Sequence, residues 1–167
     1  EVELPGLGRT RVGLRGRHQA ANVAVADALL DALEAAGIAS TPASARRAGY
    51  ATAVWPGRLE LLRIGDRDVL LDGAHNPSGA AALAVALDDL RPFLADGPVT
   101  LITASMADKD VEGVIAALLQ AGALAKARIV CTNMDLPRAL PASELAARWR
   151  AHRPDGTISA EPDPIAA

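Results

Sequence analysis

The sequence holds few aromatic residues and only one cysteine. Aromatic side chains make up 2% of its 167 residues and hydrophobic residues 50%, so alanine, leucine and valine have to build the core. The single cysteine, Cys131, excludes an internal disulfide bond and is typical of a cytoplasmic protein. Because it lies in the apolar stretch IVCT, we expect Cys131 to be a small core residue.

Further absences exclude whole classes of protein. No apolar run approaches the ~20 residues that cross a membrane, and the N-terminal EVELPGLGRT lacks the apolar segment of a signal peptide. Twenty acidic residues oppose 17 basic ones, and a net charge of −3 argues against a broad nucleic-acid interface, which needs a basic face. We therefore expect a cytoplasmic protein that binds neither a membrane nor nucleic acid.

The first part of the chain predicts short strands, then two helices, then a hairpin. Residues 2–15 are too rich in Gly and Pro for a central strand and predict short edge strands. Residues 18–36 have helical periodicity with Gly37 as the C-cap, and a weaker helix is expected over about 43–53. One face of the first helix is expected to hold Asn22, Val23, Ala26, Leu29, Leu30 and Leu33. LELLRI and DVLLDG, joined by a GDR turn, predict a β-hairpin.

Strands and helices alternate in the second part of the chain. A helix over 77–90, with Asn76 as its N-cap and Pro77 in its first position, precedes a buried strand at 99–105. The later pattern predicts a helix over 111–118, a strand at 127–132, a helix capped by Ser143 that reaches Trp149, and a short strand TIS. This order predicts an α/β fold with a mostly parallel sheet covered on both faces.

Polar residues gather where the hairpin ends, in the stretch LLDGAHNPSG. Asp72 ends the second arm, and Asn76-Pro77 opens a helix whose N-terminus favours anions. A carboxylate and the imidazole of His75, three residues apart, can both face one crevice beyond the strand ends. The same residues are also typical of a capped turn in which His75 only bonds a backbone carbonyl. The spacing leaves a ligand site and a structural turn open.

A second polar cluster, SMADKD, follows the strand at 99–105. Ser105 and Lys109 are expected above the sheet, and Asp110 suits the N-cap of the next helix. Alone, this cluster is also typical of a solvated loop with a cap. No G-x-x-x-x-G-K-[ST] loop exists, and neither of the two lysines lies in a glycine-rich turn. Arg58, in WPGRLE, is the better candidate for a phosphate ligand, since a guanidinium matches phosphate oxygens.

Four motifs together resemble one family. WPGRLE, LLDGAHNP and MADKD, in this order, are similar to the C-terminal half of folylpolyglutamate synthase/dihydrofolate synthase, a relative of the Mur ligases. GRHQAANVAVA resembles the segment that ends the central ATPase domain of that family, and the likeness runs over about 3–132. The resemblance implies a three-layer α/β/α, Rossmann-like sheet with an antiparallel hairpin strand. It places the end of the ATPase domain plus a linker at 1–45 and a truncated Mur-ligase C-terminal domain at 46–167.

The family's activity implies roles for five residues. Such ligases use ATP and Mg²⁺ to convert a folate or dihydropteroate carboxylate into an acyl phosphate, which L-glutamate then attacks. By motif, Asn22 would approach the adenine, Arg58 the phosphates and Asp72 the ribose side. Asp72 and His75 would be the catalytic residues, and His75 with Ser105 would bind glutamate. The resemblance implies no metal ligand in this sequence, because the family's magnesium ligands lie in its N-terminal domain.

The family's phosphate loop and folate loops also lie in that N-terminal domain. We therefore expect the 167-residue chain to be inactive alone and to work with an N-terminal ATPase domain of the same protein, as a monomer. A C-terminal domain of a Mur- or cyanophycin-type amino-acid ligase is one alternative. A non-catalytic module that binds a nucleotide or an amino acid is another.

Overall fold

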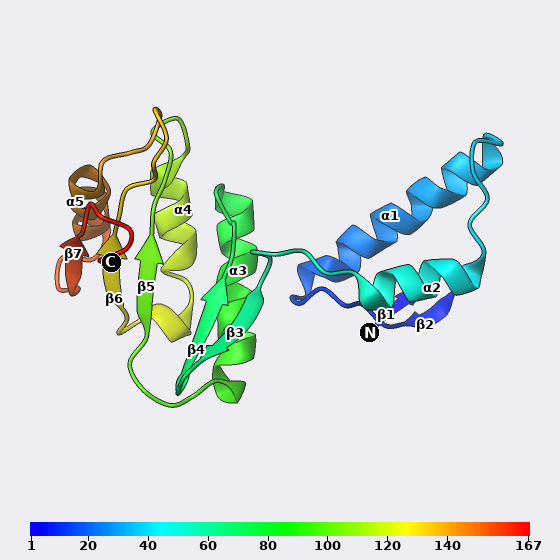
Figure 1. Cartoon of the computed structure of the whole chain (residues 1–167), viewed down its shortest axis with the longest axis horizontal. Helices are drawn as coiled ribbons and strands as arrows, with labels where there is room; N and C mark the ends of the chain where they lie inside the picture. The colour runs from blue at the N-terminus through cyan, green and yellow to red at the C-terminus, as the bar shows by residue number, and fades with distance from the viewer. The chain divides into compact units, whose positions relative to one another are not determined.

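A computed structural model describes residues 1–167, which divide into two compact units, Glu1–Gly73 and Ala74–Ala167 (Figure 1). The domain boundary that the family resemblance places between residues 45 and 46 stays a prediction. None of the helices combines the length and the apolar character that a membrane crossing requires.

The first unit contains two helices and two antiparallel hairpins. The hairpins are β1 (Val2–Leu4) with β2 (Gly8–Thr10) and β3 (Glu60–Ile64) with β4 (Arg67–Leu71); the helices are α1 (His18–Ala35) and α2 (Ala43–Thr52). The expected edge strands, both helices and the later hairpin are therefore confirmed. The turn of that hairpin is the pair Gly65-Asp66, and Gly65 has φ +62°, a conformation that glycine adopts without strain.

Gly37 ends α1 as expected. Its φ is +69°, and its N–H donates to the carbonyl of Glu34 at 2.9 Å. The N–H of Ile38 reaches back to the carbonyl of Leu33 at 3.0 Å. These two bonds are the Schellman arrangement, which satisfies carbonyls that the helix end leaves without partners.

The face that α1 buries differs from the expected one. Val23 is buried, but Leu29, which the periodicity puts on the same face, is 60% exposed. The helix instead turns Asp27 inward, where the carboxylate lies 3.2 Å from Nη1 of the buried Arg46 on α2. Because Arg46 also pairs with Asp31 and Glu34 of α1, an ion network rather than an apolar stripe joins the two helices.

The second unit is an α/β layer with a parallel sheet. Its strands β5 (Thr100–Thr103), β6 (Arg128–Cys131) and β7 (Ile158–Ala160) pair in the order β5-β6-β7, all parallel. Its helices are α3 (Pro77–Leu90), α4 (Val111–Leu118) and α5 (Ala142–His152), with short 3₁₀ turns η1 (Arg91–Phe93) and η2 (Gly122–Leu124). Together with the antiparallel hairpins of the first unit, this confirms the expected α/β class.

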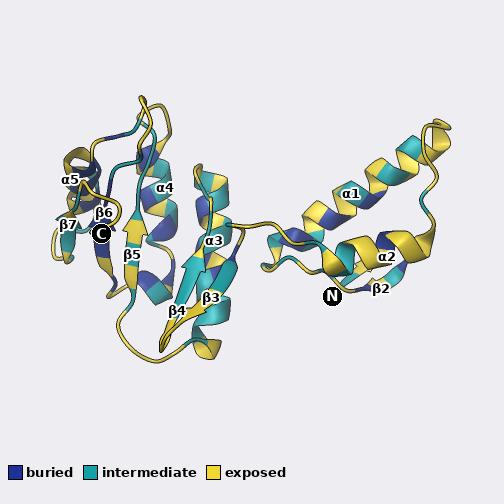
Figure 2. Ribbon diagram, viewed as in Figure 1, coloured by how far each residue is buried: buried dark blue, intermediate teal, exposed yellow.

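The core of this unit lies between the sheet and its helices. Apolar residues of α3, α4 and α5 form one cluster with Ile129 and Cys131 of β6, which are fully buried. Figure 2 shows β6 as the darkest strand and β5 as largely exposed. Burial raises the pKa of the Cys131 thiol to about 11, and this thiol is the small core residue that the sequence predicts.

Two expectations about this unit were wrong. The strand at 99–105 is not fully buried, because β5 is an edge strand whose alternate residues point to opposite faces: Leu101 packs on the core while Ile102 is 54% exposed. Ser143 does not cap α5. That helix begins at Ala142, after Pro141, and the N–H of Ala142 donates to Oδ1 of Asn133 at 2.7 Å.

Candidate functional site

The start of α1 carries three linked polar side chains, which we call the α1 triplet: His18, Gln19 and Asn22. Nε2 of Gln19 lies 2.9 Å from Nε2 of His18, and Oε1 of Gln19 accepts a hydrogen bond of 3.0 Å from Nδ2 of Asn22. Asn22 is exposed, whereas Gln19 is only 6% exposed. Sequence reasoning missed Gln19, which joins His18 and Asn22; its only signal was a polar residue inside an apolar helix.

The base of the β3–β4 hairpin brings two of the motifs together. The backbone N–H of Leu59 donates to Oδ2 of Asp72 at 2.9 Å, and the N–H of Gly73 donates to the carbonyl of Gly57 at 2.9 Å. Leu59 is 1% exposed and has φ +44°, which is uncommon for a residue with a side chain. The carboxylate of Asp72 thus holds the backbone next to Arg58, and nothing in the sequence signalled this role for Leu59.

A close approach joins the hairpin base to the start of α1. Gly16 has φ +98°, and a Cβ placed there would lie 2.6 Å from Cε1 of His18 and 2.7 Å from Cδ1 of Leu59. Only glycine allows this backbone to contact both side chains. Three motifs that are far apart in the sequence, GRHQAAN, WPGRLE and LLDG, therefore meet within the first unit.

Arg58 is one of the positive charges next to this meeting point, where Nη1 of Arg15 also donates to the carbonyl of Leu59 at 3.5 Å. Arg58 is exposed, and its guanidinium makes no hydrogen bond or ion pair in the structure. Its backbone N–H is held by the carbonyl of Trp55 at 3.2 Å, in the turn before β3. A fixed backbone with an unpaired guanidinium fork suits an anionic ligand such as a phosphate.

The second half of the DGAHNP motif belongs to the second unit. Oδ1 of Asn76 accepts a hydrogen bond of 2.7 Å from the N–H of Gly79, and Pro77 takes the first helical position, so the predicted N-cap is confirmed. His75 is exposed and directly precedes this cap at the positive end of α3. Of the two candidate catalytic residues, Asp72 belongs to the first unit and His75 to the second.

The loop after β5 is tied to the loop before α5. Met106 forms an isolated antiparallel bridge with Ala139, and the carbonyl of Ser105 accepts a bond of 2.8 Å from the N–H of Leu140. The hydroxyl of Ser105 points to the carbonyl of Met106 at 3.2 Å. Asp110 caps α4 through the N–H of Gly113 at 2.9 Å, as predicted. The backbone around Ser105 is therefore well held.

The first turns of α3 and α4 lie side by side in the second unit. A Cβ on Gly113, in α4, would lie 2.6 Å from Cγ of Pro77, in α3. His75 comes shortly before α3 and Ser105 shortly before α4. The two polar clusters predicted from the sequence therefore lie at the same end of this unit. Two neighbouring helix N-termini favour negative charge there.

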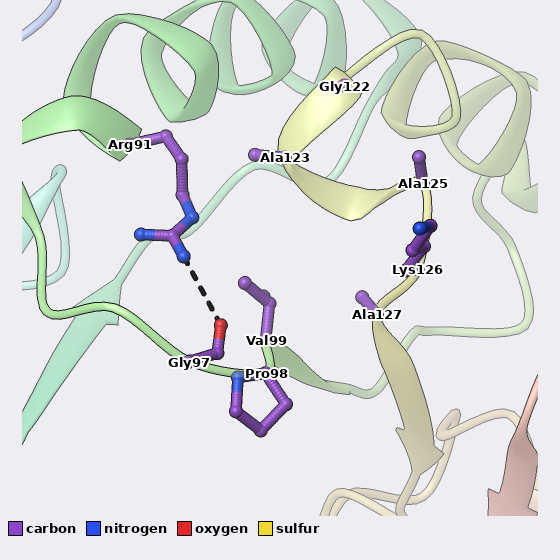
Figure 3. Close-up of a pocket in the computed structure, with 9 residues that line it drawn as sticks. All are labelled: Arg91, Gly97, Pro98, Val99, Gly122, Ala123, Ala125, Lys126 and Ala127. Carbon is purple, nitrogen blue, oxygen red and sulfur yellow. Dashed lines mark hydrogen bonds between the residues drawn. The ribbon is translucent and has the colours of Figure 1, made fainter.

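The chain offers no metal site of its own. No group of three or more His, Cys, Asp or Glu side chains lies close enough to hold a metal ion. A cavity of about 540 Å³ in the second unit is lined mainly by Gly, Ala, Pro and Val, with Arg91 and Lys126 as its charged residues (Figure 3). None of the predicted site residues lines this cavity. Nη2 of Arg91 donates a hydrogen bond of 3.2 Å to the carbonyl of Gly97.

Comparisons with known proteins show the family of the chain. Residues 57–167 match the family described as "Mur ligase, glutamate ligase domain". The chain is 37% identical to the dihydrofolate synthase/folylpolyglutamate synthase of Mycobacterium tuberculosis, over 96% of this chain and 32% of the relative. The structure of M. tuberculosis folylpolyglutamate synthase complexed with ADP superposes with a TM-score of 0.75 and 32% identity, over 96% of this chain and 34% of that one.

A second solved structure is a bifunctional folylpolyglutamate synthase/dihydrofolate synthase with Mn, AMPPNP and L-glutamate bound. It superposes with a TM-score of 0.65 and 25% identity, over 93% of this chain and 37% of that one. The chain thus spans about a third of the length of the relatives that it matches.

Proposed function

The chain belongs to the Mur ligase family and carries its glutamate ligase domain, and from this we propose that it is part of an ATP-dependent ligase that adds L-glutamate to a folate or dihydropteroate carboxylate. The names of its relatives support this proposal, as do the ADP, AMPPNP and L-glutamate bound to two of them. The observation that supports it is the meeting of GRHQAAN, WPGRLE and LLDG around Gly16 and Leu59, because these motifs carry the exposed Asn22 and Arg58 that the proposal assigns to the nucleotide.

The first unit would hold the nucleotide. Asn22 would contact the adenine through its exposed amide, and Arg58 would neutralise phosphate charge with its guanidinium fork. Asp72 would lie toward the ribose, and its bond to the N–H of Leu59 would also fix the direction in which Arg58 leaves the backbone. Cations and donors set around developing negative charge are what phosphoryl transfer requires of a protein.

The second unit would position glutamate. When the glutamate amine attacks the acyl phosphate, a C–N bond forms, the C–O bond to phosphate breaks, and the amine loses a proton. His75 and the first turns of α3 and α4 would stabilise the negative charge that the phosphate carries away, and Ser105 would help to bind glutamate.

The remaining partners lie outside this chain. No cluster of acidic or histidine side chains here can hold Mg²⁺, so the metal would be bound by an N-terminal ATPase domain of the same protein. That domain would also supply the phosphate loop that the sequence lacks. We expect the complete enzyme to be a cytoplasmic monomer.

The experiment compares the complete reading frame that encodes this chain with the 167-residue chain alone. The complete protein should add glutamate to dihydropteroate or tetrahydrofolate with release of ADP, and the chain alone should not, because it lacks a phosphate loop. Addition of an amino acid to a different acceptor would instead favour a Mur- or cyanophycin-type ligase. Nucleotide binding without turnover by the complete protein would favour a binding module.

His75→Ala in the complete protein tests the second unit. Because His75 is exposed, its removal should leave the unfolding midpoint within a degree or two, roughly the effect of a neutral surface change. We expect kcat to fall by about 10²-fold or more, the size of effect seen when a charge-stabilising donor is lost. An unchanged rate would remove His75 from the mechanism.

A further inference from the structure

In the α1 triplet, both the nitrogen and the oxygen of the Gln19 side-chain amide have partners within the protein. Gln19 is 6% exposed, and its Nε2 lies 2.9 Å from a ring nitrogen of His18, Nε2. Its Oε1 accepts from Nδ2 of Asn22 at 3.0 Å. A buried amide with two short contacts is held in place, because turning it over would require His18 to move its hydrogen to Nε2 and the amide of Asn22 to turn over as well.

The direction of these bonds decides which group Asn22 can offer. An amide has one donor end and one acceptor end, so Nε2 of Gln19 must donate to Nε2 of His18, whose ring then carries its hydrogen on Nδ1. The group of Gln19 that faces Asn22 is therefore its carbonyl oxygen, which accepts a hydrogen bond from Nδ2 of Asn22. The exposed Asn22 is left with its carbonyl oxygen as an acceptor without a protein partner, and with the second hydrogen of Nδ2.

The histidine end of the α1 triplet is held by the backbone. A Cβ at Gly16 would lie 2.6 Å from Cε1 and 2.8 Å from Nδ1 of His18, so the chain packs directly against the ring. The N–H of Gln19 donates to the carbonyl of Gly16 at 3.0 Å, which fixes the first turn of α1. The imidazole therefore has little room to rotate away from Gln19.

We propose that Gln19 determines the nucleobase specificity of the site, by holding Asn22 in the orientation that reads adenine and rejects guanine. An asparagine amide pairs with adenine when its oxygen accepts from the 6-amino group and its nitrogen donates to N7, whereas guanine presents acceptors at both positions. The structure leaves Asn22 with this acceptor and this donor. The inference rests on the proposed function, in which Asn22 contacts the adenine of ATP.

Two substitutions of similar size separate this role from simple packing. Gln19→Glu keeps an acceptor for Nδ2 of Asn22, while Gln19→Met keeps the length of the side chain and removes both polar ends. A residue that only fills buried space should tolerate Met better than a buried carboxylate. If Gln19 orients Asn22 instead, Gln19→Glu should keep the preference for ATP over GTP better than Gln19→Met does.

The kinetic test measures kcat/KM for ATP and for GTP in glutamate addition by the complete protein. We expect a wild-type preference for ATP, a loss of roughly tenfold or more of this preference in Gln19→Met, and the wild-type preference in Gln19→Glu. Any other ranking of the two variants overturns the proposal. A wild type that adds no glutamate with ATP overturns the proposed function itself, which is a different result from an active enzyme with an unaltered preference.

A second measurement needs neither turnover nor ligand. The nitrogen chemical shifts of the three histidines of the chain report which ring nitrogen carries the hydrogen. Neutral His18 should carry it on Nδ1 in the wild type and on Nε2 in Gln19→Glu, because the carboxylate can only accept. A wild-type His18 with its hydrogen on Nε2 overturns the proposal, whatever the kinetics show and even if neither variant folds.

Discussion

Tyr50 is the residue whose titration the structure perturbs in the most measurable way. Burial, followed by the hydrogen bond that its hydroxyl donates to Oδ1 of Asp27 at 2.9 Å, raises the pKa of Tyr50 from 10.0 to about 12. Tyr50 is the only tyrosine in the sequence, so absorbance at 295 nm reports this one phenol. We expect a titration midpoint near 12 in the folded chain, and near 10 after unfolding in guanidinium.

The sign of the stability change follows from these two values. Between pH 10 and pH 12 the unfolded chain loses the phenolic proton while the folded chain keeps it, so the free energy of unfolding falls as the pH rises through this window. Below pH 10 the phenol is protonated in both states and contributes no slope. Tyr50→Phe should remove this part of the pH dependence, and a folded-state midpoint near 10 would show that the contact with Asp27 does not form in solution.

At the scale of residues, local chemistry was predictable and long-range contacts were not. Asn76 and Asp110 were recognised as helix caps because a cap depends only on the next three residues. The role of Leu59 depends on Asp72 reaching its backbone N–H in the folded chain, and no local pattern encodes that approach. The roles proposed for Asn22, Arg58, Asp72, His75 and Ser105 come from the family's motifs and await the experiments above.

At the scale of elements, α3 offers a direct test of a cap that lies inside a functional motif. Asn76→Ala removes the acceptor for the N–H of Gly79 and should lower the free energy of unfolding by about 1 kcal/mol, measured in urea. Asn76→Asp should retain most of the stability, because a carboxylate accepts the same bond and favours the helix N-terminus.

Ser78→Ala is the matched control for this cap. Ser78 is exposed in the first turn of α3, and its hydroxyl makes no hydrogen bond in the structure, so the change should stay within about 0.5 kcal/mol. Equal losses for Asn76→Ala and Ser78→Ala would show that the cap contributes nothing. In the complete enzyme, Asn76→Ala should reduce kcat less than His75→Ala does, because it shifts the backbone of the motif without removing its imidazole.

The bounds of the elements were predicted well, and their exposure was not. The predicted helix over 77–90 matches α3 residue for residue, since periodicity, cap and Pro at the first position agree. For α1, Leu29 has the spacing of the expected face but is exposed, because only Val23 of that face is buried and the helix turns Asp27 inward to Arg46. Which neighbour covers a helix is decided by tertiary contacts that periodicity cannot supply.

At the scale of the whole molecule, the two units have cores of very different size. The first unit has a buried cluster of only Leu4, Leu7 and Val23, supplemented by the ion network of Arg46. The cluster of the second unit joins three helices to the sheet, includes the fully buried Trp149, and contains no residue of the first unit. Since apolar burial is the main stabilising term, the second unit should be the more stable one.

Hydrogen exchange followed by mass spectrometry tests this difference. Amides of β6 in the second unit should exchange most slowly, and those of α1 in the first unit much sooner, because protection follows local burial. Leu145→Ala removes a 2% exposed side chain from the larger cluster and should destabilise the second unit by about 2–5 kcal/mol, with faster exchange in β6. Exchange in α1 should not change, since its buried residues belong to the other cluster. Equal acceleration in α1 and β6 would show instead that the chain unfolds as one cooperative body, in which the small core of the first unit depends on the large core of the second.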